Sequence, residues 1–316
     1  MKKKSSWIVL AATLLITVPA RLYQMFFLMD KETGFYTDGG LTTGIVSFVL
    51  LVGTVVLIVL GRTDGEAPEA YRPIRSRFAA VSGVLAGLGL LLEGLVSMVS
   101  GGKENFVMFL ILSLVGMVTG VVLIFTAYDF STGSNRFTKY PLLALAPPIW
   151  GCTALVTLFI SYVAVANVTE NIFNTFTVAF LLLFLFSQAK MIAGVEEKKS
   201  GRMVSIFGLP AILFCLVTGI PGTAGALAGL REVGFFPVGL HFVDVLMAFY
   251  LTAFLTELRR RPGGETAEDD RKEAHSAGTN PSGAKPELLA GFLSDAYQST
   301  ETFAERAPSP FLSPKS

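Results

Sequence analysis

Ionisable side chains interrupt three of the apolar stretches of this sequence. Arg21 and Gln24 lie in the first stretch, Glu93 in the third, and His241 and Asp244 in the last. A guanidinium binds an anionic group, carboxylates exchange protons or cations, and an imidazole one helical turn from a carboxylate tunes its charge. Charged groups within membrane segments typically mark ion pathways or proton relays, so these five residues form the candidate site.

The apolar stretches that carry these residues predict the fold class. Of the 316 residues 52% are hydrophobic and 16% are charged, and the mean hydropathy is +0.60, whereas about 25% of residues are charged in an average soluble protein. Runs of about 20 apolar residues predict an all-α, polytopic integral membrane protein. We expect eight transmembrane helices, at residues 7–29, 41–60, 79–100, 106–128, 140–165, 172–194, 203–220 (with an extension to 229 left open) and 237–257.

The first stretch also resembles a secretory signal. It has a basic head, MKKKSS, then WIVLAATLLITV and a Val18-Pro19-Ala20 segment with small residues where a signal peptidase would cut. However, the apolar pattern continues to Met29, whereas the apolar core of a signal is typically about 7–15 residues. We therefore expect an uncleaved span in which Arg21 is embedded.

Basic residues near the span ends predict the orientation, because cytoplasmic loops are enriched in Lys and Arg. The side that holds only Lys31, Lys103 and Arg231 is expected to be external. Both termini are then cytoplasmic, and the protein is expected in the plasma membrane. The cytoplasmic side would hold Lys2, Lys3, Lys4, Arg62, Arg72, Arg75, Arg77, Arg136, Lys139, Lys198, Lys199, Arg202, Arg259, Arg260 and Arg261.

The embedded charges are expected to lie in one layer. At about 1.5 Å per helical residue, Arg21, Glu93 and Asp244 are each about 10–12 Å below the outer surface. A lone charge at a span centre costs about 2.5–3.5 kcal/mol, so lipid-facing positions are unfavourable. We therefore expect Arg21 to pair with Glu93, Asp244 or both. Two alternatives remain open, namely a purely structural ion pair and extension of Arg21 to the lipid headgroups.

Glycine and proline residues predict details of the bundle. Gly83xxxGly87 and Gly116xxxGly120 favour close packing of the third and fourth spans. Pro147-Pro148 and Pro210 are expected to interrupt spans five and seven, as a kink or as a break that exposes backbone carbonyls. The segment after span seven, GIPGTAGALAGLREVGFF, is either an outer loop or a re-entrant segment.

The composition changes after Leu258. Residues 1–258 are expected to form the transmembrane bundle, and residues 259–316 a cytoplasmic tail that is mostly disordered, since its first part is charged and rich in Gly, Pro, Ser and Thr. Apolar residues at helical spacing predict a short amphipathic helix near 286–305. This helix either lies free or docks on the membrane surface or on a protein partner.

Missing motifs exclude several functions. The sequence has no GxxxxGK[ST], HExxH or GxSxG motif, and its cysteines, Cys152 and Cys215, lie in separate apolar runs. We therefore expect no enzyme, cofactor or metal site, and a net charge of +1 gives no indication of nucleic-acid binding. The leading hypothesis is a small-molecule or ion permease in the lipid bilayer. The alternative is a non-enzymatic sensor or assembly scaffold that acts through its loops and tail.

Two segments carry a family resemblance. RLYQMFFLMDKETGFY, which includes Arg21, Gln24 and Asp30, and PLLALAPPIWGC, at the start of span five, resemble multi-spanning membrane proteins of Gram-positive anaerobes. The resemblance covers about a tenth of the chain. It implies a prokaryotic plasma membrane and brings no activity, substrate or site residue with it.

Overall fold

Eight helices long and apolar enough to cross a membrane make up the described part of the chain. The computed structural model describes residues 5–30, 36–63, 75–100, 106–162, 168–229 and 238–260. The predicted all-α fold is thereby confirmed, and so is the predicted number of helices of spanning length and composition among the described residues. The helices are α1 (Ser5–Tyr23), α2 (Leu41–Thr63), α3 (Arg77–Ser100), α4 (Phe106–Thr132), α5 (Ala146–Tyr162), α6 (Val168–Ile192), α7 (Glu197–Leu227) and α8 (Val238–Arg260).

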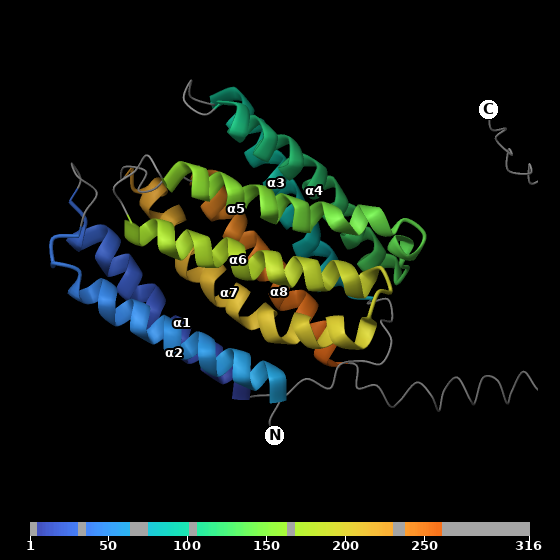
Figure 1. Cartoon of the computed structure of the whole chain (residues 1–316), viewed down its shortest axis with the longest axis horizontal. Coiled ribbons are helices and arrows are strands. Elements are labelled where there is room, and N and C mark those ends of the chain that lie inside the picture. Colours follow the sequence, from blue (N-terminus) through green and yellow to red (C-terminus); the bar gives the residue numbers. More distant parts are fainter. Residues whose placement is uncertain are drawn as a thin grey trace, which may run out of the picture. The chain divides into compact units, whose positions relative to one another are not determined.

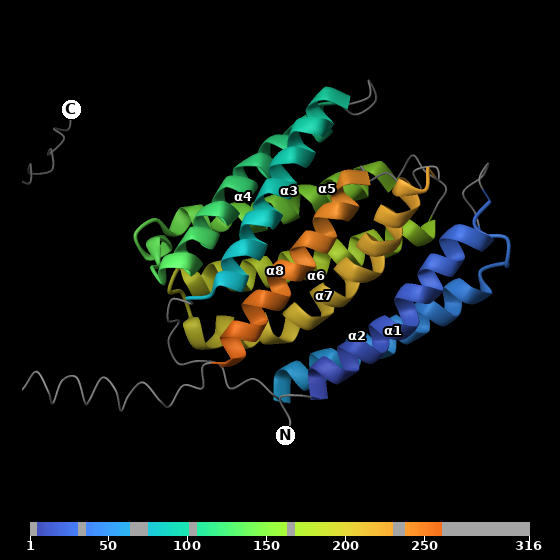
Figure 2. The same cartoon turned by 180° about the vertical axis from the view of Figure 1, so that it is seen from behind.

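Six of the helices form a ring. Each of α3 to α7 packs against the next helix along the chain, and α8 packs back against α3 and closes the ring (Figures 1 and 2). The short connections expected between spans make sequential neighbours antiparallel. The core lies at the centre of this ring, where Trp150, Phe184 and Tyr250 are buried.

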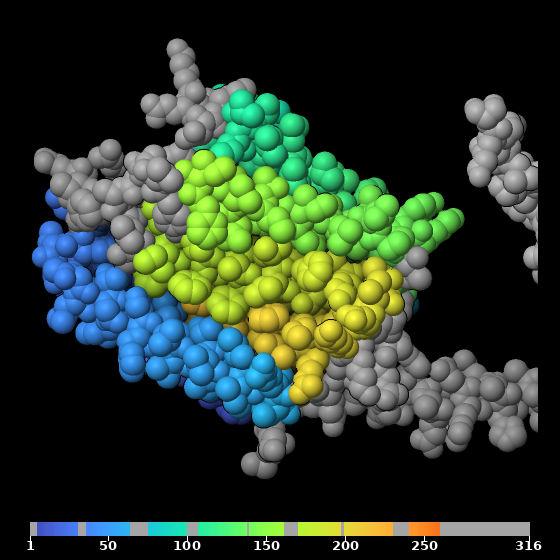
Figure 3. All heavy atoms as spheres, in the orientation of Figure 1, coloured from blue at the N-terminus to red at the C-terminus, as the bar shows by residue number. Residues whose placement is uncertain are grey.

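Helices α1 and α2 form a hairpin outside the ring. Both pack against α7, and the space-filling view shows the blue surface of the hairpin along the flank of the yellow-green and yellow helices (Figure 3). Nη1 of Arg259 donates to Oγ of Ser6 at 2.9 Å, which joins the last turn of α8 to the first turn of α1. The outer faces are apolar, with Leu15 78% and Phe48 67% exposed, as expected for surfaces that contact lipid.

Helices α3 and α4 approach closely at a pair of glycines. A methyl group at Gly87 would lie 2.6 Å from the carbonyl oxygen of Gly120, and a methyl group at Gly120 would lie 2.6 Å from that of Gly87. A side chain at either position would therefore separate the two backbones. The close packing predicted from the glycine spacing is confirmed.

Helix α7 is longer than the span predicted from the sequence. It runs without interruption from Glu197 to Leu227, through Pro210 and Pro221, so the alternative of a break at Pro210 is wrong, while a kink there stays a prediction. Residues 219–227 are part of this helix and form neither an outer loop nor a re-entrant segment. Pro147 and Pro148 lie in the first turn of α5, where a missing backbone N–H is tolerated. The tail from residue 261, with the amphipathic helix predicted near 286–305, lies outside the described residues.

Candidate functional site

The end of α1 sets the position of the first group of candidate residues. After Tyr23 the helix widens into a π-helical turn, η2 (Gln24–Leu28), and the chain then doubles back so that Met29 pairs with Tyr36. The backbone N–H of Thr37 donates to the carbonyl of Leu28 at 2.8 Å. This turn brings the Tyr36 side chain back to Arg21.

Arg21 is buried and paired with an acidic residue. Only 1% of it is exposed. Its Nη2 lies 2.7 Å from Oε1 and 2.5 Å from Oε2 of Glu170, in the first turn of α6. Its Nη1 donates to Oε1 of Gln24 at 3.1 Å and to the hydroxyl of Tyr36 at 3.0 Å, and its guanidinium carbon lies 4.7 Å from the ring centre of Phe173. The charge of Arg21 is thereby neutralised within the protein.

The expected pairing of Arg21 with Glu93 or Asp244 is therefore wrong. The predicted spans at residues 140–165 and 172–194 leave Glu170 in the connection between them, outside any helix. In the structure α6 begins at Val168, and Glu170 is buried in its first turn. An acidic residue there is favoured by the positive end of the helix dipole. The helix-dipole rule and the need for a counter-charge to Arg21 together could have indicated Glu170 from the sequence.

Tyr36 and Gln24 complete the network around this ion pair. The Tyr36 hydroxyl donates to Oε1 of Glu170. Burial and the nearby Glu170 carboxylate raise the pKa of Tyr36 well above its ordinary value, so the hydroxyl stays protonated and keeps this hydrogen bond. Nε2 of Gln24 donates to the hydroxyls of Thr42 at 3.1 Å and Thr43 at 3.3 Å. The network thus joins α1 and α2 to α6.

Asp244 lies apart from this ion pair, at a small cavity inside the ring. The cavity, between α5, α6 and α8, is also bordered by His241 and Asn174. Within the described residues Asp244 has no hydrogen bond or ion pair, and Nδ2 of Asn174 and Nδ1 of His241 have no hydrogen-bond partner. The cavity volume is about 10 Å³, which is close to the least space that holds one water molecule.

His241 borders the same cavity as Asp244. It packs against α7 at Gly222, where a methyl group would lie 2.5 Å from Cγ of the imidazole. The imidazole thus lies where α7 meets the Asp244 cavity.

Glu93 borders a second cavity of about 10 Å³, between α3, α4 and α5. Oγ of Ser97 donates to its carboxylate at 2.9 Å, and Ser113 lies on the opposite wall. The structure therefore divides the five predicted residues. Arg21 and Gln24 belong to the junction between hairpin and ring, while Glu93, His241 and Asp244 lie at the two cavities.

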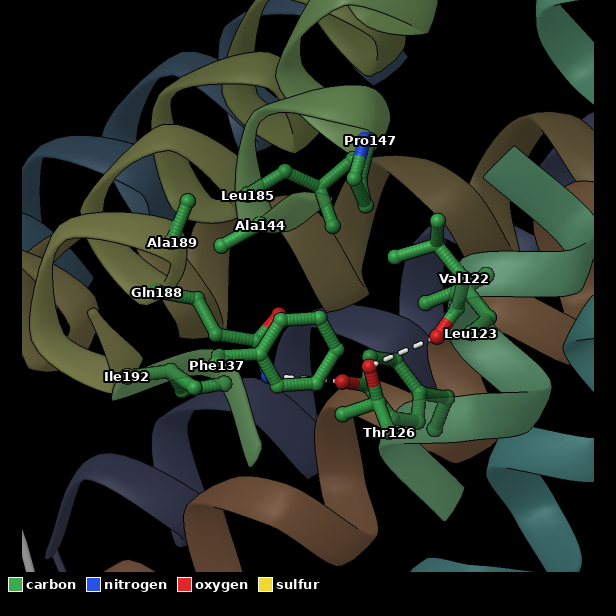
Figure 4. Close-up of a pocket in the computed structure, with 11 residues that line it drawn as sticks. Val122, Leu123, Thr126, Phe137, Ala144, Pro147, Leu185, Gln188, Ala189 and Ile192 are labelled. Carbon is green, nitrogen blue, oxygen red and sulfur yellow. Dashed lines mark hydrogen bonds between the residues drawn. The ribbon is translucent and has the colours of Figure 1, made fainter. Parts of the chain in front are cut away.

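A third cavity, of about 20 Å³, lies nearer the end of the ring where α4 and α6 terminate. Figure 4 shows its wall, formed by Thr126, Phe137, Pro147 and Gln188 among others. Nε2 of Gln188 donates to the hydroxyl of Tyr250 at 2.7 Å. No signal in the sequence singled out this pair, because Gln and Tyr are common in membrane helices without any pathway role.

Comparison with protein-family models, with curated proteins and with solved structures finds no match to this chain.

Proposed function

We propose that the chain is a small-molecule or ion permease of the plasma membrane, driven by or carrying protons through the six-helix ring, with Asp244 as the group whose charge is exchanged. The observation that carries this proposal is the setting of Asp244. Its half-buried side chain borders a small cavity between α5, α6 and α8 and has no counter-charge among the described residues.

The energetic argument contrasts Asp244 with Glu170. A buried carboxylate is tolerated where a cation and hydrogen bonds compensate it, and Glu170 has Arg21 and Tyr36 for this purpose. Asp244 is half-buried and has no such partner among the described residues, so its ionised form is less favourable than that of Glu170 until a proton or a small cation arrives. A site whose charge depends on what it binds is what coupled transport requires.

The cavity supplies the means to deliver a proton. A single water molecule there would accept from Nδ2 of Asn174 and donate to the Asp244 carboxylate, and His241 offers a further polar atom. Buried waters typically make about three hydrogen bonds, so these side chains suffice to hold one. His241 would then adjust the charge of the site, as the sequence predicts.

Arg21 and Gln24 have a different role in this proposal. Arg21 already binds Glu170, and Gln24 links it to α2. We assign both residues to the attachment of the hairpin to the ring rather than to the pathway itself. We further propose that the end of the bundle that holds the first turn of α1 and the last turn of α8 faces the cytoplasm, since the sequence concentrates Lys and Arg next to these helix ends.

The test uses a reagent for protonated carboxyl groups in apolar surroundings and a measurement of proton flux. The purified protein is treated with dicyclohexylcarbodiimide across a range of pH and analysed by peptide mass spectrometry. We expect labelling of Asp244 that falls as the medium becomes alkaline, and no labelling of Glu170. In proteoliposomes with an internal pH indicator, we expect proton uptake that is lost in Asp244→Asn.

Glu196→Gln is the matched control, because Glu196 is an exposed carboxylate that pairs with Lys190 in the loop before α7. This variant should take up protons like the wild type. Wild-type uptake by Asp244→Asn, in protein that is monodisperse in detergent, would refute the role of Asp244. Absence of uptake by every form, the wild type included, would remove the support for a proton pathway.

A further inference from the structure

The Glu93 and Asp244 cavities share part of their walls. Trp150 and Leu240 border both of them. Glu93 and Ser97 on one side and Asp244 and Asn174 on the other are therefore separated by one indole ring and one leucine side chain. Nothing in the sequence predicts that Trp150 lies between two cavities.

Trp150 has an unusual setting for a buried tryptophan. It is 3% exposed and borders both cavities, so its indole N–H can donate to a molecule held in either of them. A buried indole N–H normally has a hydrogen-bond partner. A water molecule in either cavity would supply that partner, so Trp150 offers the one polar group of the shared wall, while Leu240 is wholly apolar.

A glycine of α4 lies beside the Trp150 indole. On the α4 side it faces Gly116, where a methyl group would lie 3.4 Å from Nε1 and 3.5 Å from Cδ1. Because Gly116 has no side chain, the pyrrole edge of the indole is not held by a neighbouring group there. A small rotation of the ring would change the separation between the two cavities.

We propose that Trp150 gates proton transfer between Glu93 and Asp244, and that the Glu93 cavity is the entry to the pathway. This inference rests on the proposed function of Asp244. Glu93 and Ser97 lie in the last two turns of α3 and Phe109 lies in the first turn of α4, so the Glu93 cavity extends toward the end of the ring opposite the last turn of α8.

The proposed transfer conserves charge and protons. The Glu93 carboxyl group releases a proton to a water molecule in its own cavity and becomes a carboxylate. The resulting hydronium passes a proton to the water molecule beside Asn174, and the Asp244 carboxylate accepts it. Glu93 then regains a proton from the outer medium. The indole N–H orients the water molecules by donating to one of them.

Fluorescence offers a direct test, because Trp7 and Trp150 are the two tryptophans of the chain. In Trp7→Phe protein all tryptophan emission comes from Trp150. A protonated carboxyl group quenches a neighbouring indole, so we expect the emission to change when the medium is titrated. Both Glu93→Gln and Asp244→Asn, made in this background, should remove part of the change.

The outcomes separate the two proposals. If Glu93→Gln leaves the titration unaltered while Asp244→Asn alters it, Glu93 is not on the pathway and the gating inference fails, although the proposed function stands. If the emission of Trp150 does not respond to pH at all, the inference fails as well. Wild-type proton uptake by Asp244→Asn is the separate result that refutes the proposed function.

A second measurement tests the indole N–H itself. Trp150→Phe keeps an aromatic wall and removes the donor. We expect the initial rate of proton uptake to fall about fivefold to tenfold, since one neutral hydrogen bond is lost, whereas equilibrium carbodiimide labelling of Asp244 keeps its wild-type extent. Gly116→Ala is the companion variant, because its methyl group is accommodated at 3.4 Å and restricts the ring. A wild-type rate in both variants would overturn the inference.

Discussion

Arg21 binds both carboxylate oxygens of Glu170, at 2.7 and 2.5 Å from Nη2, and so joins the first helix of the chain to the sixth. The pair lies where the α1–α2 hairpin meets the ring. Tyr36 adds a hydrogen bond to the carboxylate from the turn between α1 and α2. Because this junction is buried and charged, it fixes the hairpin in one position more strictly than apolar contacts alone would.

The first prediction concerns the stability of this junction. Glu170→Gln leaves the Arg21 guanidinium buried without a counter-charge, which typically costs about 3–5 kcal/mol. We expect a clearly lower thermal unfolding midpoint in detergent, measured by circular dichroism. Glu196→Gln removes an exposed ion pair instead and should leave the unfolding midpoint close to that of the wild type.

A variant in which the two charged residues are exchanged distinguishes the effect of charge balance from the effect of side-chain shape. Arg21→Glu combined with Glu170→Arg keeps one charge of each sign at the junction. We expect the double variant to recover part of the midpoint that either single variant loses. An unchanged midpoint in Glu170→Gln would show that the ion pair does not contribute to the stability of the fold.

Hydropathy and the distribution of Lys and Arg were sufficient to predict eight helices and nearly all their positions. These signals are local, and a membrane requires each span to satisfy its own backbone hydrogen bonds. The partner of Arg21 was not predictable in the same way, because it depends on how helices pack around α7. The start of α6 was placed at residue 172, a few residues too late, and that error concealed Glu170.

The second prediction concerns orientation. In a variant without Cys152 and Cys215, a cysteine at Thr37 or at Val195 samples opposite ends of the bundle. Both positions are exposed. We expect a membrane-impermeant maleimide to label Thr37→Cys in intact cells and Val195→Cys only after the cells are opened. Labelling of Val195→Cys in intact cells would reverse the proposed orientation.

The third prediction concerns the pH dependence of the start of α2. The Asp38 carboxylate accepts the backbone N–H groups of Gly40 and Thr42 and the hydroxyl of Thr42. The hydrogen bonds from Thr42 lower the pKa of Asp38 below its ordinary value. The stabilisation is therefore complete above the ordinary pKa and is lost as the pH falls through the lowered one.

Hydrogen exchange measures this effect. At neutral pH we expect Asp38→Ala to speed amide exchange in the first turn of α2 and to leave α4 unchanged. After correction for the intrinsic pH dependence of exchange, the wild type should approach the variant only in strongly acidic medium. Equal protection of the two proteins at neutral pH would contradict a capping role for Asp38.

The residues that we propose for the pathway differ in how far the sequence could single them out. Glu93, His241 and Asp244 were recognisable because a titratable group within an apolar run is costly and therefore informative. Trp150 and Asn174 could not be recognised in this way, because aromatic and amide side chains are ordinary in membrane helices. Their proposed roles follow from the cavities they border, and a cavity exists only once the helices are packed.

The last prediction concerns the hydrogen bond between Gln188 and Tyr250 in the third cavity. Tyr250→Phe removes the acceptor of Nε2 of Gln188 and leaves a buried amide unsatisfied, at a cost of about 1–3 kcal/mol. The double variant Gln188→Leu with Tyr250→Phe replaces both partners with apolar groups and should regain most of that stability. If protons leave the ring through this cavity, the double variant stays stable in detergent but its uptake in proteoliposomes remains low. Wild-type uptake by the stable double variant would confine the Gln188–Tyr250 pair to a structural role and place the inner half of the pathway elsewhere in the ring.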